Sequence, residues 1–166
     1  MKIAIDLRSL SSGTISGVEN YCLNLIENLP RLDKANRYLF LYNAFQNKNL
    51  PDFHFVNSEI KHSKFPNKIL NLAFKFGFRK LEDITGPIDW FFMPNLNQFN
   101  IHSKTKLAIT VHDLSPVITP ELYDLKRRVW HTFLNYKKAF KRANILFAVS
   151  EFTKNDLVNI FEIDPK

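Results

Sequence analysis

A short apolar run that ends in polar residues constrains the fold of this chain more than any other feature. Residues 107–111 read Leu-Ala-Ile-Thr-Val, and His112, Asp113 and Ser115 follow directly. Apolar residues at consecutive positions favour a strand buried on both faces, as in a parallel sheet. Open α/β sheets bind ligands just beyond the carboxyl ends of such strands. We therefore expect His112 at the floor of a ligand cleft; a structural histidine bonded to nearby backbone is the alternative.

Strand-like and helix-like segments alternate along the rest of the sequence. Apolar runs predict further strands at 2–7, 38–42, 52–57, 88–93 and 144–149, whereas 58–63 is polar and predicts a loop. Helical periodicity predicts helices from Val18 to an end at Pro30, within 61–80, over 121–142 and over 151–161. This alternation implies right-handed crossovers. The expected fold class is α/β: one Rossmann-like, doubly wound domain over residues 1–166, with a mainly parallel sheet of about six strands and helices on both faces.

Polar residues follow several of the predicted strands. Arg8, Asn95, His112 and Ser150 each come just after an apolar run. Because the carboxyl ends of parallel strands lie along one edge of a sheet, these four residues are expected to gather on one rim.

The first predicted strand and helix are joined by a loop that contains Gly13, Ser16 and Gly17. Such a loop lets backbone amides approach a phosphate at the helix N-terminus. Ser16 and Glu19 also have the spacing of a capping box, and the negative charge of Glu19 would compete with a bound anion. A ligand-binding loop and a simple turn with a helix cap are therefore both open interpretations.

Composition narrows the class of protein. The formal charge is +7 with a pI near 9.5, which predicts an anionic partner. The single cysteine, Cys22, lies on the apolar side of the first predicted helix and is expected in the core, and no metal-site spacing is present. Asp6 comes too early for a signal peptide, and no run is long enough to span a membrane. A cytoplasmic location is the resulting expectation.

Segment 61–80 has an unusual composition. It contains five lysines and Arg79, interleaved with four phenylalanines, and no acidic residue. A basic, aromatic-rich helix opening near Pro66 is typical of a segment that lies on a membrane surface. A partly buried helix with solvated lysines is the alternative, because its apolar positions cover more than one face.

Five segments together resemble a known family. They are residues 5–8 (Ile-Asp-Leu-Arg) with 16–21 (Ser-Gly-Val-Glu-Asn-Tyr), 92–95 (Phe-Met-Pro-Asn), 110–116 (Thr-Val-His-Asp-Leu-Ser-Pro) and 148–157 (Ala-Val-Ser-Glu-Phe-Thr-Lys-Asn-Asp-Leu). In this order they resemble the N-terminal domain of a family-4 (group 1) glycosyltransferase of the GT-B architecture, over nearly the whole chain.

The resemblance implies two Rossmann-like domains that face a cleft. The N-terminal domain mainly holds the acceptor, a glycan or a lipid-linked molecule, and the C-terminal domain holds the nucleotide-sugar donor. It implies a retaining sugar transfer in which the Gly17 loop lies near the donor diphosphate and His112 contacts the transferred sugar. No metal and no cofactor is required by this layout. The donor-binding domain has no counterpart in these 166 residues, so we expect the chain alone to fold but not to catalyse transfer.

These arguments yield one candidate catalytic residue, His112. The candidate substrate-binding residues are Arg8, Gly13, Ser16, Gly17, Asn95, Asn97, Asp113, Ser150 and Glu151. A competing function is a non-catalytic module that binds an anionic membrane surface or nucleic acid through residues 61–80. Of these two partners nucleic acid is the less favoured, because the sequence carries no recognised nucleic-acid-binding motif. Both functions are compatible with a peripheral position at the inner face of a membrane.

Overall fold

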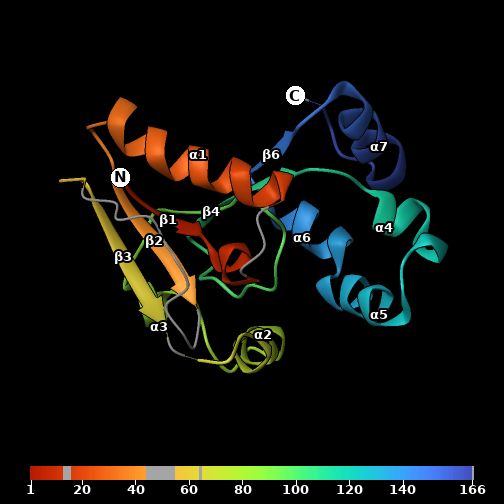
Figure 1. Cartoon of the computed structure of the whole chain (residues 1–166), viewed down its shortest axis with the longest axis horizontal. Helices are drawn as coiled ribbons and strands as arrows, with labels where there is room; N and C mark the ends of the chain where they lie inside the picture. Colours follow the sequence, from red (N-terminus) through yellow and green to blue (C-terminus); the bar gives the residue numbers. More distant parts are fainter. Residues whose placement is uncertain (13–15, 44–54, 64, 166) are drawn as a thin grey trace.

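The computed structural model describes residues 1–12, 16–43, 55–63 and 65–165. All strands of the described chain join one parallel sheet of six strands, in the order β3-β2-β1-β4-β5-β6 (Figure 1). The strands are β1 Lys2–Asp6, β2 Arg37–Asn43, β3 Ser58–Ser63, β4 Trp90–Met93, β5 Lys106–Val111 and β6 Ile145–Ala148. The α/β Rossmann-like fold predicted from the sequence is thereby confirmed.

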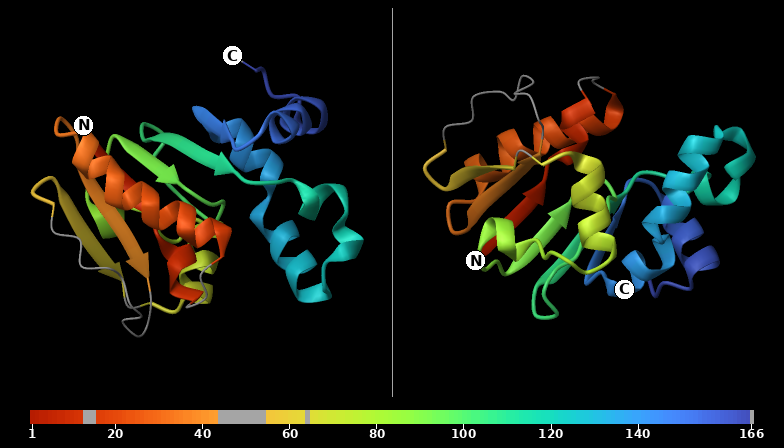
Figure 2. Two further views of the ribbon diagram at one scale, coloured as in Figure 1. Left: turned by 45° about the horizontal axis from the view of Figure 1, so that its top comes forward. Right: turned by 90° about the horizontal axis from the view of Figure 1, so that it is seen from below.

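The helices form layers on both faces of this sheet (Figure 2). The longer ones are α1 Gly17–Leu32, α2 Asn67–Lys75, α5 Leu125–Leu134, α6 Tyr136–Arg142 and α7 Glu151–Phe161. The shorter ones are α3 Glu82–Thr85, α4 Ser115–Ile118 and the 3-10 turns η1 Arg8–Ser12 and η2 Pro120–Leu122.

Two apolar clusters hold the layers together. On one face, Ile26 of α1 packs with Ile5 and Phe40 of the first two strands. On the other face, α2, α6 and α7 contribute a larger cluster that includes Phe74, Phe140 and residues of β4 and β5. The alternation of strand side chains between the two clusters follows from the two-residue period of a strand. Cys22 is fully buried, as expected for a core residue, and burial raises the pKa of its thiol to about 11.

The third strand lies later in the chain than the sequence predicts. Residues 52–54 of the predicted strand fall outside the described residues, and residues 55–57 form a turn. The strand is Ser58–Ser63, a segment that was predicted as polar loop. It is an edge strand that pairs only with β2, so most of its side chains keep contact with water and no apolar run is needed.

The helix predicted over 121–142 is divided. After η2, α5 ends at Leu134, Asn135 adopts a left-handed conformation with φ 51° and ψ 66°, and α6 then begins at Tyr136. Asn tolerates this conformation better than most residues, and its side chain accepts a hydrogen bond from the Lys138 amide, so Asn135 caps α6 as well.

The first predicted helix also differs in extent. Helix α1 continues through Pro30 to Leu32, because a proline in the last turn interrupts only one of the backbone hydrogen bonds. Within segment 61–80, the helix expected to open near Pro66 is confirmed as Asn67–Lys75, and residues 61–63 belong to β3. No helix in the described ranges is long and apolar enough to cross a membrane.

The sixth strand was expected to be buried, and this is wrong. β6 is an edge strand, and Ile145 and Phe147 remain 40% and 47% exposed. Both point to the face covered by α1, because they line a cavity together with Tyr21, Leu25 and Leu29 of that helix. An apolar cavity of about 420 Å³ lies there, lined among others by Trp90, Phe92 and Ala108.

Candidate functional site

A small cavity with both polar and apolar walls lies at the carboxyl edge of the sheet. It has a volume of about 140 Å³, and its lining includes Val18 from α1, Asn95 after β4, and Thr110, His112 and Asp113 from the end of β5. His112, which the sequence predicts at the floor of a ligand cleft, lines this cavity together with Asn95 and Asp113. Three segments distant in sequence meet here because parallel strands end at a common edge.

The His112 ring is held in one orientation. Its Nε2 lies 2.8 Å from the carbonyl oxygen of Pro94, and since a carbonyl only accepts, Nε2 carries the hydrogen. On the neutral ring Nδ1 is then the acceptor. The Tyr21 ring packs edge-on against the imidazole at 5.2 Å between centroids, and the Tyr21 hydroxyl lies 3.1 Å from Thr110 Oγ1. The backbone oxygen of His112 accepts a hydrogen bond from the Thr153 hydroxyl of α7. His112 is half-buried, so one side of the ring can meet a ligand.

The N-terminus of α1 lies beside the histidine. The Glu19 carboxylate accepts hydrogen bonds from the Ser16 amide at 2.9 Å and from the Ser16 hydroxyl. Burial by itself raises the Glu19 pKa. The hydrogen bonds from Ser16, the hydrogen bond from the Glu19 amide and the nearby His112 together outweigh burial, so the Glu19 pKa lies below its usual value. Glu19 thus keeps its negative charge at this helix end, and a phosphate binding there must displace it.

The glycine loop is only partly described. Gly13 lies outside the described residues. Gly17 is the first residue of α1 and is exposed, and a Cβ added at this position would meet no atom within 4 Å. The space beside Gly17 is therefore open to a ligand. Ser16 is also exposed, but its hydrogen-bonding groups are engaged with Glu19.

A second group of polar side chains continues from Asp113 away from the sheet. Asp113 accepts from the Ser115 amide at 2.9 Å, and the Ser115 hydroxyl lies 2.6 Å from the Tyr123 hydroxyl. His131 and Tyr136 are joined by a 2.7 Å hydrogen bond and line the same cavity as His112. Burial, with the charge of Asp113, raises the Tyr136 pKa, whereas burial lowers the His131 pKa.

Sequence reasoning misses the part that three residues play at this site. Tyr21 contacts the His112 ring without lining the cavity, and in the sequence it belongs to the apolar face of the first predicted helix. The cavity residues His131 and Tyr136 fall inside one predicted helix. A tyrosine at a core position of a helix is a weak signal for a site, because its hydroxyl requires a polar partner when buried. No sequence signal could reveal His131 and Tyr136, since the break at Asn135 brings them together.

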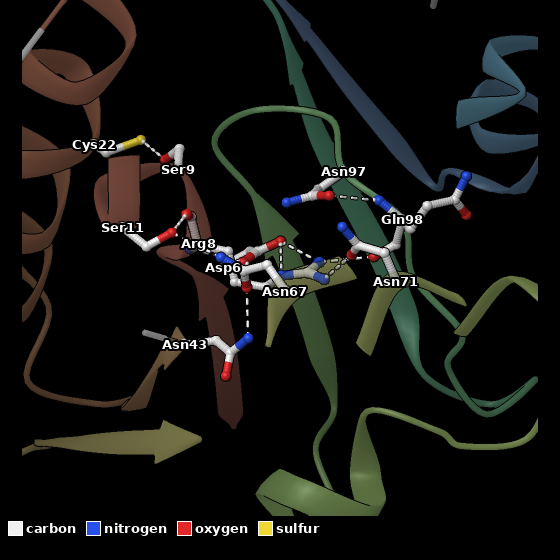
Figure 3. Close-up of polar contacts among 10 residues, drawn as sticks. All are labelled: Asp6, Arg8, Ser9, Ser11, Cys22, Asn43, Asn67, Asn71, Asn97 and Gln98. Atoms are coloured by element: carbon white, nitrogen blue, oxygen red, sulfur yellow. Dashed lines mark hydrogen bonds and ion pairs between the residues drawn. The ribbon is translucent and has the colours of Figure 1, made fainter. Parts of the chain in front are cut away.

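Arg8 does not lie on the open rim, which corrects the sequence prediction (Figure 3). Its guanidinium forms a buried ion pair with Asp6, with Nη2 2.6 Å from Oδ2 and Nε 2.8 Å from Oδ1. It also donates to Asn71 Oδ1 at 2.9 Å and to the Gln98 carbonyl at 2.7 Å. The Arg8 residue is only 3% exposed. Arg8 therefore joins β1, α2 and the loop after β4 rather than presenting a free cation to a ligand.

The remaining predicted residues lie around the cavity without lining it. Asn97 accepts from the Gln98 amide at 2.9 Å and lies toward the Arg8 cluster (Figure 3). Ser150 caps α7, its hydroxyl oxygen accepting from the Thr153 amide at 3.1 Å. Glu151 is exposed in the first turn of α7 and lies 3.9 Å from Lys154. Through Thr153, this helix end is connected to His112 but does not line its cavity.

The site offers oriented hydrogen-bond donors and acceptors rather than a metal centre. Within the described ranges, no group of three or more His, Cys, Asp or Glu side chains is arranged to hold a metal ion. No protein-family model matches the sequence, and no curated protein matches it at a significant level.

Proposed function

We propose that this chain is the acceptor-side domain of a retaining glycosyltransferase of the GT-B architecture. The observation that carries the proposal is the cavity around His112. Segments 16–21, 92–95 and 110–116 are among those that together resemble the glycosyltransferase family, and each contributes a residue to this one cavity: Val18, Asn95 and His112. Parallel topology brings these segments to one edge of the sheet, and residues that share a function are expected to lie together in this way.

The chemistry of sugar transfer matches what the cavity offers. Positive charge develops on the sugar ring and negative charge on the departing phosphate, and fixed dipoles stabilise both with little reorganisation. The Pro94 carbonyl fixes the His112 tautomer so that Nδ1 accepts a hydrogen bond from a sugar hydroxyl. His112 thereby positions the transferred sugar, and Asn95 and Asp113 contact the hydroxyls of the donor sugar or the acceptor.

The proposal requires a second Rossmann-like domain for the nucleotide-sugar donor. All strands in the described residues belong to one sheet, and α1 retains the Glu19 carboxylate at its N-terminus. A diphosphate presented by the other domain would approach beside Gly17 and displace this carboxylate. We expect no sugar transfer by the 166-residue chain alone, and detectable turnover would contradict the need for a second domain.

Sugar binding to the chain tests the proposal directly. Backbone amide spectra are recorded while nucleotide sugars and simple glycans are added one at a time. We expect shifts at Tyr21, Asn95, His112 and Asp113 with at least one sugar, and their loss in His112→Ala. His102→Ala is the matched control, because His102 is an exposed histidine before β5 that does not line the cavity. Shifts that persist in His112→Ala, or no shift with any sugar, would reject the assignment.

A further inference from the structure

A second cavity lies away from the His112 site. It is an open groove of about 740 Å³ lined by the end of α2, the loop after β4, and α5–α6. These elements lie on the side of the sheet opposite α1 (Figure 2). Four cationic side chains line it: Lys75, Lys138, Lys141 and Arg142. None of its described lining residues is acidic. Such a groove attracts an anion, and burial of the anion between low-dielectric walls strengthens the attraction.

Two of these cations are already held in place. Lys75 Nζ lies 3.6 Å from the centre of the Phe133 ring, and this contact joins α2 to α5. Arg142 Nη2 donates to the Thr105 carbonyl at 2.7 Å. Lys138 and Lys141 are exposed, and no ion pair joins either to a described carboxylate. These two lysines are therefore free to bind an external anion.

An exposed apolar stripe borders the groove. Ile69, Leu72 and Phe76 lie at successive turns along α2 and are 57%, 46% and 63% exposed, and Phe76 also lines the groove. Phe78 follows Phe76 and is 83% exposed. Helix α2 already buries its opposite side through Leu70 and Phe74. Its second apolar face is therefore largely open to solvent, and a contiguous exposed apolar patch marks an interaction site.

We propose that this face binds a membrane surface, with the phosphate of an anionic phospholipid in the groove and the stripe entering the headgroup region. An apolar stripe beside clustered lysines is the arrangement of interfacial helices, whose affinity adds apolar burial to attraction by anionic lipids. The nine-residue helix α2 lies on the bilayer and does not cross it. This inference goes beyond the proposed sugar transfer and stands independently of His112.

The stripe favours a lipid over a nucleic acid. Single-stranded nucleic acids bind to cations along a track with aromatic rings that stack on bases. Ile69 and Leu72 cannot stack in this way, but both gain free energy on entering an acyl layer. The cations of the groove would bind a lipid phosphate and a free phosphate in the same way. The apolar stripe favours the lipid, because only a lipid also offers an acyl layer to Ile69 and Leu72.

Co-sedimentation with vesicles tests the proposal. We expect the chain to bind vesicles of phosphatidylcholine with phosphatidylglycerol, to bind pure phosphatidylcholine weakly, and to dissociate as salt is raised. Lys138→Gln with Lys141→Gln should weaken binding roughly 30-fold, because each lysine near an anionic surface contributes about a factor of five. Leu72→Ser with Phe76→Ser should weaken it about tenfold through lost apolar insertion.

Matched variants keep the test specific. Lys34→Gln with Lys154→Gln removes the same charge from exposed lysines outside the groove, and Phe152→Ser removes an exposed phenylalanine from α7. Both should bind as the natural chain does, as should His112→Ala. Equal loss in the lysine control, equal binding to neutral vesicles, or displacement by soluble glycerol phosphate at low concentration would overturn the proposal. Tighter binding to single-stranded RNA that depends on the same lysines would also overturn it.

Discussion

At the residue scale, the Asp6–Arg8 pair shows how a charge at a strand end can be structural. The side chains are 2% and 1% exposed, and every contact of the guanidinium joins β1 to other elements. In such a buried pair, the cost of removing each charge from water is offset by the attraction between the two charges. Removal of one partner leaves the other uncompensated in the interior.

Replacement of Arg8 by methionine should therefore lower the free energy of unfolding by about 3–5 kcal/mol. Urea titration followed by circular dichroism measures it. Arg127→Met is the comparison, because its ion pair with Asp124 is exposed at 70% and 62% and should contribute less than about 1 kcal/mol. A similar loss in both variants would mean that Arg8 is not anchored as described.

The single residue Asp33 makes a pH-dependent contribution to the free energy of unfolding. Its carboxylate accepts from the Tyr38 hydroxyl at 2.6 Å, from the Asn36 side chain and from two backbone amides, and these bonds lower the Asp33 pKa from 3.8 to about 2. Because the folded pKa is depressed, the stabilisation is complete above the unfolded value and disappears as pH falls through the folded value. Asp33→Asn should be less stable than the natural chain at pH 6, and the difference should shrink between about pH 4 and pH 2. A constant difference in urea midpoints across that range would contradict this.

At the scale of elements, the break at Asn135 decides how the β5–β6 connection folds. One continuous helix over 121–142 would carry α6 away from the sheet, whereas the left-handed residue lets Ala139 and Phe140 enter the core. The same break brings His131 within hydrogen-bond distance of Tyr136 beside the cavity. The geometry of one backbone position thus shapes the wall of the candidate site.

Two substitutions at position 135 separate backbone strain from the cap. Asn135→Gly keeps the left-handed conformation and loses only the bond to the Lys138 amide, whereas Asn135→Ala loses both. We expect the alanine variant to be less stable than the glycine variant by about 1 kcal/mol. Thermal unfolding of the two proteins measures the difference. Equal stability would mean that the left-handed conformation is not required at this position.

At the scale of the whole molecule, the sequence predicts elements by their local patterns and misses what long-range contacts create. The central strands were found because burial on both faces leaves an apolar run. β3 was missed because an edge strand needs no such run. The convergence of Asn95 and His112 followed from parallel topology alone. The withdrawal of Arg8 into the interior could not be predicted, because it depends on Asn71 and Gln98, far along the chain.

The exposed apolar side chains of β6 and the cavity beside them give the molecule a property that can be measured as a whole. Phe147 lies edge-on to Phe92 at 5.8 Å and lines the apolar cavity of about 420 Å³. A dye such as anilinonaphthalene sulfonate fluoresces when it enters exposed apolar surface of this kind. We expect the folded chain to enhance dye fluorescence and Phe147→Ser to reduce it by about half or more, with little loss of stability, because Phe147 is already 47% exposed. Phe152→Ser, on α7 and outside this cavity, should leave the fluorescence unchanged. Equal reduction by both variants would place the dye elsewhere on the surface.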